Sequence, residues 1–171
     1  MSIPSSRLGY LVGLLACVAL LAFALYLQYV EHQDPCPLCL VQRVAFMGLA
    51  LIFLIAAIHG PRKTAAWAYS AVLVLLAAGG GAVAARQVWL QSLPKNMVPE
   101  CGPGLEYMLE RFPFHKVFDM VLRGSGECAE VGWKFLGLSI AGWSLVWFVL
   151  LGALAVASAV KARGKPGMFE S

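Results

Sequence analysis

Four long apolar runs constrain the fold of this chain more than any other feature of its sequence. Each run has about 20 residues, the length of helix needed to cross the hydrocarbon core of a bilayer. A spanning segment must pair its backbone polar groups internally, which a helix does. The sequence therefore predicts an all-α membrane protein, a four-helix transmembrane bundle with spans at about residues 9–30, 39–58, 64–85 and 136–160.

The composition agrees with this class of protein. Hydrophobic residues make up 60% of the chain and charged residues only 13%, whereas a soluble domain is about 45–50% apolar. We therefore predict a single integral membrane domain over residues 1–171, with the lipid bilayer and no nucleic acid as partner. The first run exceeds the apolar core of a signal peptide, about 7–15 residues, so we expect it to remain as a spanning helix.

The distribution of lysine and arginine predicts the orientation of the bundle. The first loop, residues 31–38, contains neither residue, whereas the second loop and both termini are basic. Because short basic segments stay in the cytoplasm, we expect both termini to be cytoplasmic and the loops at 31–38 and 86–135 to lie on the outer side. The basic residues in question are Arg7, Arg62, Lys63, Lys161, Arg163 and Lys165.

A Cys-x-x-Cys motif, Cys36 to Cys39, stands where the first outer loop meets the second apolar run. Pro37 lacks an N–H group and favours the first position of a helix, so we expect Cys39 in the first helical turn. Thiols at a helix start meet unpaired N–H groups and the positive end of the dipole, which favours thiolate. Arg43 follows one turn later on the same face and adds a cation. The motif alone predicts either a redox-active dithiol or half of a zinc site.

Two further cysteines, Cys101 and Cys128, lie in the long outer loop. With Cys36 and Cys39 they face one oxidising side, where disulfides are favoured over zinc ligation. A Cys101/Cys128 bridge could be a structural staple worth about 3–4 kcal/mol, whereas the small Cys36/Cys39 ring would stabilise little. The same loop contains an amphipathic stretch, residues 112–122, which we expect to lie as a short helix on the membrane surface.

These features together resemble the bacterial disulfide bond formation protein B family, DsbB. The shared features are the order of four spans, a Cys-x-x-Cys that opens the second span with Arg43 four residues on, and a second cysteine pair in the long outer loop. The resemblance covers nearly the whole chain. It includes the sequence around and after the last cysteine, Gly126-Glu127-Cys128-Ala129-Glu130, then Trp133 and Phe135-Leu136-Gly137-Leu138.

The resemblance implies a thiol:quinone oxidoreductase of the bacterial inner membrane, with its redox cysteines on the periplasmic side. An enzyme of this kind reoxidises a DsbA-type periplasmic thioredoxin-fold protein. It passes the electrons to a membrane quinone, ubiquinone or menaquinone, as cofactor.

The resemblance also implies a role for each site residue. Cys36, Cys39, Cys101 and Cys128 are the catalytic residues. The partner's thiolate attacks Cys101 of a Cys101/Cys128 disulfide, and the released Cys128 attacks Cys36. Cys39 is left as thiolate against the quinone, where Arg43 binds the cofactor and stabilises negative charge.

One position departs from the family pattern. Some members have a histidine near the outer end of the third span, and Gln87 takes its place here. Two other classes also stay open from the sequence. One is a non-catalytic membrane module with structural disulfides. The other is a four-helix enzyme of the vitamin K epoxide reductase kind, which orders its cysteines differently.

Overall fold

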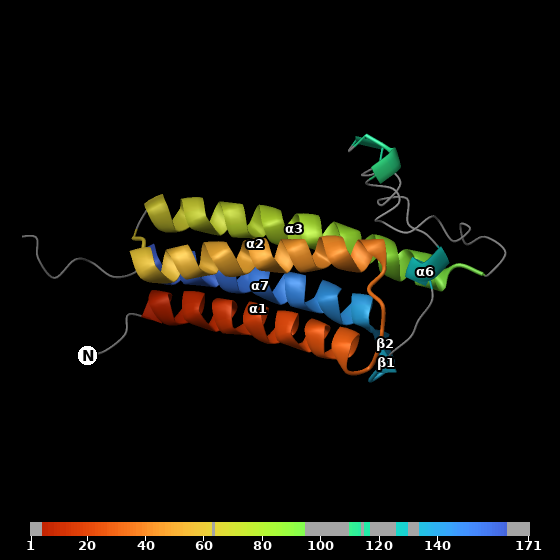
Figure 1. Cartoon of the computed structure of the whole chain (residues 1–171). Coiled ribbons are helices and arrows are strands. Elements are labelled where there is room, and N and C mark those ends of the chain that lie inside the picture. Colours follow the sequence, from red (N-terminus) through yellow and green to blue (C-terminus); the bar gives the residue numbers. More distant parts are fainter. Residues whose placement is uncertain are drawn as a thin grey trace, which may run out of the picture.

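The computed structural model describes residues 5–62, 64–94, 110–113, 115–116, 126–129 and 134–163 of the chain. The described residues form a bundle of four long helices, which run side by side (Figure 1). All four helices are long and apolar enough to cross a membrane, which confirms the predicted four-helix membrane bundle. They are α1 Ser5–Tyr29, α2 Pro37–His59, α3 Thr64–Ser92 and α7 Ile140–Arg163.

The start of α2 is built by its first residues. Pro37 occupies the first helical position and Cys36 is the N-cap, with an extended backbone. The Cys36 sulfur accepts a hydrogen bond from the Cys39 backbone N–H at 3.3 Å, which pairs one of the donors that a helix start leaves open. Cys39 therefore lies in the first turn, as predicted. At the other end, Gly60 has a left-handed backbone and its N–H bonds the Ala56 carbonyl.

Helix α3 is longer than its apolar run. It continues to Ser92, whereas the apolar run that predicts the span ends at about residue 85. Polar residues can extend a helix beyond the hydrocarbon layer, and Arg86 supports this extension by lying 4.7 Å from the centre of the Trp89 ring. The extension matters for the site because it carries the buried residues Gln87 and Leu90.

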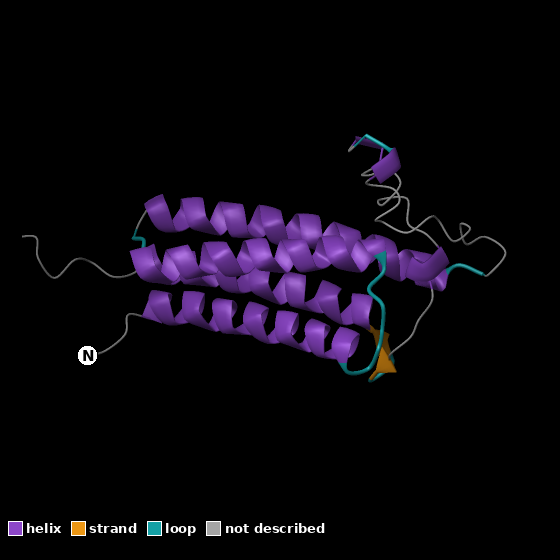
Figure 2. Ribbon diagram, viewed as in Figure 1, coloured by secondary structure: helices purple, strands orange, loops and turns teal. Residues whose placement is uncertain are grey.

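The chain enters its last helix through a small β-hairpin. Strand β1, Lys134–Phe135, pairs antiparallel with β2, Leu138–Ser139, and Figure 2 shows both strands at one end of the bundle. The turn residues Leu136 and Gly137 have positive φ angles of 51° and 81°, as the two central residues of a tight hairpin turn require. Helical residues need negative φ, so α7 begins at Ile140, after the first residues of the apolar run that predicts a span at about 136–160.

Close apolar packing holds the middle of the bundle. Phe46 of α2 stacks on Phe148 of α7 with ring centroids 4.2 Å apart, and Phe53 of α2 is fully buried. Gly80 of α3 lies against the Phe148 ring, and this ring occupies the space that a Cβ on residue 80 would need. Small residues at such contacts let spanning helices approach closely. Cys17 is also buried in this core, where a thiol packs as a small hydrophobe.

A four-residue helix, α6 Gly126–Ala129, lies at the same end of the bundle as the hairpin and the start of α2 (Figure 1). It packs mainly against α3. Cys101 and most of the predicted surface helix at 112–122 lie outside the described residues. The positions expected for these two features therefore stay predictions.

Candidate redox site

The two thiols of the Cys-x-x-Cys motif face each other at the start of α2. Their sulfur atoms are 2.7 Å apart, and a disulfide needs about 2.03–2.05 Å between its sulfurs. Cys36 is buried, whereas Cys39 is partly exposed and lines a cavity. The pair can therefore form or open a disulfide with a small movement, and only Cys39 presents its side chain to the cavity.

Cys128 brings a third thiol against this pair. It is carried by α6, is fully buried, and belongs to the same apolar cluster as Cys36, Leu38 and Leu90. The side chains of Cys128 and Cys36 are hydrogen-bonded to each other. The structure thus brings three of the predicted catalytic cysteines together, and Cys101 lies outside the described residues.

The surroundings of Cys36 act against ionisation of its thiol. From the sequence we expect the helix start to favour thiolate at both cysteines of the motif. In the structure, the hydrogen bond with Cys128, the hydrogen bond with Cys39 and burial raise the pKa of the Cys36 thiol. Two thiol neighbours and apolar surroundings outweigh the two N–H donors of this sulfur, the Cys39 backbone and the Gln87 amide. At Cys36 these neighbours therefore oppose the thiolate that the helix start favours.

Two buried glutamines complete the surroundings of the sulfurs. Gln87 of α3 donates its amide Nε2 to the sulfurs of Cys36 and Cys39, at 3.3 Å to each. Gln42 of α2 donates its own Nε2 to the Gln87 Oε1 at 2.7 Å. From the sequence, Gln87 stands out only as a departure from the family pattern, and Gln42 is not among the predicted site residues. The available signal was an amide inside an apolar run, which needs a partner when it is buried.

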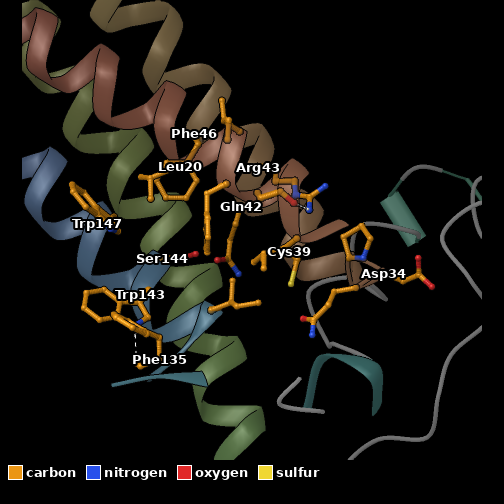
Figure 3. A pocket seen from close by; sticks show the side chains of 17 residues that line it. Leu20, Asp34, Cys39, Gln42, Arg43, Phe46, Phe135, Trp143, Ser144 and Trp147 are labelled. Atoms are coloured by element: carbon orange, nitrogen blue, oxygen red, sulfur yellow. Dashed lines mark hydrogen bonds between the residues drawn. The ribbon is translucent and has the colours of Figure 1, made fainter. Parts of the chain in front are cut away.

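Arg43 lies one turn beyond Cys39, as predicted, and its hydrogen bonds run to α1. The guanidinium donates to the side-chain oxygen of Gln28 and to the Ala24 carbonyl, the latter at 2.9 Å. These bonds join α2 to α1 and hold the cation at the wall of the cavity that Cys39 also lines (Figure 3). Sequence reasoning missed Gln28, because no local pattern pairs residues on two different spans.

A cavity of about 500 Å³ opens beside Cys39. This volume lies in the range of small-molecule sites, about 300–1,000 Å³. Figure 3 shows the aromatic side chains of Phe46, Trp143 and Trp147 around it, contributed by α2 and α7. Most of the wall is apolar, and the polar side chains on it are Gln33, Asp34, Cys39, Gln42, Arg43 and Ser144.

The hairpin closes one side of this cavity. Phe135 of β1 lines it, and the Trp143 indole N–H donates to the Phe135 carbonyl at 3.0 Å, the dashed line in Figure 3. The Ser139 hydroxyl donates to the Gln91 side-chain oxygen of α3 at 2.6 Å. The hairpin is therefore fastened to both α7 and α3.

Spanning helices, thiols clustered at one end of the bundle and an apolar cavity beside one of those thiols define a membrane thiol–disulfide oxidoreductase. Comparison with known proteins gives the family. The model of the family "Disulfide bond formation protein DsbB" matches residues 6–158. The chain belongs to the DsbB family, as the motifs suggested, and is a multi-pass membrane oxidoreductase of disulfide bond formation.

Individual relatives agree with the family model over almost their whole length. The chain is 54% identical over 145 residues to disulfide bond formation protein B of Hahella chejuensis. The aligned residues make up 85% of this chain and 88% of the relative. It is 47% identical over 156 residues to the protein of the same name from Methylococcus capsulatus, and these residues make up 91% of this chain and 95% of that protein.

Proposed function

We propose that this chain reoxidises a DsbA-type periplasmic thioredoxin-fold protein by disulfide exchange and passes the electrons to a membrane quinone. The observation that carries the proposal is the position of Cys36, which is hydrogen-bonded to both Cys128 and Cys39 while Cys39 lines the cavity. Thiols in this arrangement connect the outer loop, where a soluble partner can bind, with a cavity between the spanning helices.

The first exchanges take place among the partner, Cys101 and Cys128. The partner's thiolate attacks Cys101 of the Cys101/Cys128 disulfide, so a mixed disulfide forms and Cys128 leaves as thiolate. Cys128 then attacks Cys36 of the Cys36/Cys39 disulfide, so one S–S bond forms, another breaks, and Cys39 leaves as thiolate. The buried contact between Cys128 and Cys36 supports this second exchange.

The remaining exchanges leave the partner oxidised and Cys36/Cys39 reduced. The partner's second thiol attacks its own sulfur in the mixed disulfide, which closes the partner's disulfide and releases Cys101. Cys101 then attacks Cys128, which restores their disulfide and releases Cys36. The raised pKa of Cys36 favours uptake of a proton by this leaving sulfur. The two electrons of the partner now reside on the Cys36/Cys39 pair.

The cavity fits a quinone as the electron acceptor. A quinone head group is a flat ring with carbonyl oxygens, and the cavity offers aromatic walls together with the donors of Gln42 and Arg43. When bound, ubiquinone or menaquinone would take up two electrons and two protons. The indole rings of Trp143 and Trp147 would hold the ring in place. Arg43, fixed by its bonds to α1, stabilises negative charge at the Cys39 sulfur.

We place the protein in the bacterial inner membrane with both termini in the cytoplasm. The thiol end of the bundle lies opposite the start of α1 and the end of α7 (Figure 1). The basic residues Arg7 and Arg62 stand at that opposite end, which the cytoplasmic preference of basic segments favours. The cysteines then face the oxidising periplasm.

The proposal is tested by following ubiquinone absorbance without oxygen. Purified, detergent-solubilised protein is mixed with ubiquinone and excess reduced DsbA-type protein, and the assay is repeated with menaquinone. We expect one quinone to be consumed for each partner dithiol oxidised. The Cys17→Ser variant, which alters a thiol in the core of the bundle, serves as the control and should turn over normally. No loss of either quinone, with both outer cysteine pairs present as disulfides, would indicate a module with structural disulfides instead.

A further inference from the structure

The buried pair of Gln42 and Gln87 is the part of the site that disulfide exchange itself does not use. Each residue is only 4% exposed, and each lies in a helix long and apolar enough to cross a membrane. Burying an amide is unfavourable unless its hydrogen bonds are made. The pair makes these bonds with itself and with the sulfurs of Cys36 and Cys39.

The hydrogen bond between the two amides determines which end of Gln87 faces the sulfurs. A glutamine amide has one accepting oxygen and one donating nitrogen. Because Gln42 donates to the Gln87 Oε1 at 2.7 Å, the Gln87 Nε2 is directed to the sulfurs of Cys36 and Cys39. The Cys39 sulfur also lies 3.6 Å from the Gln87 Oε1, where a protonated thiol can donate. Gln87 can thus serve Cys39 both as thiol and as thiolate.

We propose that Gln87 is a catalytic residue that stabilises the reduced Cys36/Cys39 pair, and that Gln42 is a positioning residue that orients the Gln87 amide. This inference rests on the redox role proposed above for the pair. According to this inference, the Gln87 amide on α3 controls how readily the Cys36/Cys39 disulfide at the start of α2 accepts electrons.

The physical reason is the difference between thiolate and disulfide as hydrogen-bond acceptors. A hydrogen bond to an ionised acceptor is about twice as strong as one between neutral groups, so the Gln87 N–H groups favour the reduced, thiolate-containing pair. Stabilising the reduced form makes a disulfide more oxidising. With the amide reversed, its oxygen would face the sulfurs and oppose thiolate. The Gln42 N–H prevents this reversal because it needs the Gln87 oxygen as acceptor.

The test is a redox titration of the Cys36/Cys39 pair in glutathione buffers, using the full chain in detergent. Differential alkylation and peptide mass spectrometry report the oxidation state of this pair separately from Cys101/Cys128. We expect Gln87→Met to lower the equilibrium constant for reduction about tenfold, which is about 30 mV for a two-electron couple. Gln42→Met should lower it about threefold, since the amide then loses the partner that orients it.

The double variant separates a positioning role from a structural one. If Gln42 acts through Gln87, the Gln42→Met/Gln87→Met protein has the same equilibrium constant as Gln87→Met alone, whereas independent effects would multiply. Multiplying effects, or unchanged constants in both single variants, would overturn the proposal. Should Gln87→Met fail to fold, Gln87→Asn replaces it, because the shorter side chain withdraws the amide from the sulfurs.

Gln91 provides a matched control on the same helix. It lies one turn beyond Gln87 and bonds Ser139 of the hairpin. Gln91→Met should leave the equilibrium constant unchanged, and a shift equal to that of Gln87→Met would refute the specific role of Gln87. The titration contains neither quinone nor soluble partner, so it reports on the two glutamines whatever the quinone assay shows.

Discussion

The middle of the bundle and its cysteine end hold their helices together by different means. In the middle, apolar surfaces are in direct contact, as where Gly80 of α3 meets the Phe148 ring of α7. At the cysteine end, polar side chains cross from one helix to the next. Gln42 of α2 bonds Gln87 of α3, and Arg43 of α2 bonds groups on α1.

This difference separates stability from reactivity. Van der Waals packing is sufficient to associate helices in lipid and requires no polar group. Redox chemistry needs charged and hydrogen-bonding groups next to the sulfurs, and polar groups within spans are costly and tend to be functional. Changes in the middle should therefore affect unfolding, and changes at the cysteine end should affect electron transfer.

The largest effect is expected from Cys39→Ser at the cysteine end. Serine cannot form a disulfide with Cys36 or act as a thiolate, so quinone consumption should fall to the rate without enzyme. The partner should still be trapped on Cys101, visible as a mixed disulfide on a non-reducing gel. Normal turnover by this variant would refute the role assigned to Cys39.

Arg43→Met should have the next largest effect. It removes the cation from the cavity wall together with the bonds to Gln28 and Ala24. Hydrogen bonds from charged groups contribute about 1.5–3 kcal/mol, so kcat/KM for quinone should fall about 10- to 100-fold. The kcat/KM of Arg43→Lys should lie between those of Arg43→Met and the wild type, because lysine keeps the charge and loses the planar fork of the guanidinium. Equal kcat/KM values for Arg43→Met and the wild type would contradict a role at the cavity.

Two adjacent glycines of α3, Gly79 and Gly80, test the packing in the middle of the bundle. A Cβ at Gly80 would meet the Phe148 ring and lie 3.0 Å from the Ala45 Cβ, whereas a Cβ at Gly79 has nothing within 4 Å. Gly80→Ala should lower the free energy of unfolding by about 1–3 kcal/mol through overpacking, and Gly79→Ala should not. Thermal unfolding in detergent measures this, with quinone turnover per folded molecule unchanged in both. Equal stabilities of the two variants would argue against close packing at Gly80.

Trp143→Phe should give the smallest effect, at the border between the two regions. It removes the indole hydrogen bond to the Phe135 carbonyl, worth about 0.5–1.5 kcal/mol, and should raise the KM for quinone only a few-fold. Trp67→Phe, at an exposed position of α3, is the control and should change nothing. A complete loss of turnover would place Trp143 in the chemistry rather than in the fastening of the hairpin.

The ends of the helices show where sequence reasoning stops. The spans follow from apolar length, yet α3 continues through Arg86 and Gln87 to Ser92, because helical hydrogen bonds do not require apolar side chains. Leu136 and Gly137 belong to the last apolar run, yet they form a turn with positive φ angles, and α7 begins only at Ile140. The length of a hydrophobic run reflects the thickness of the membrane that it crosses. The residue at which the helix begins depends instead on the backbone conformation.

The chain's sequence is enough to establish a four-helix membrane protein, the Cys-x-x-Cys at a helix start, Arg43 one turn later and the family. These are local features: apolar length, proline at a first helical position and the i, i+4 spacing act within one segment. Only the tertiary structure decided that Cys128 packs against Cys36 and that Gln87 donates to both sulfurs of the motif. Gln87 and Cys39 are 48 residues apart in sequence, and they meet because α2 and α3 pack side by side.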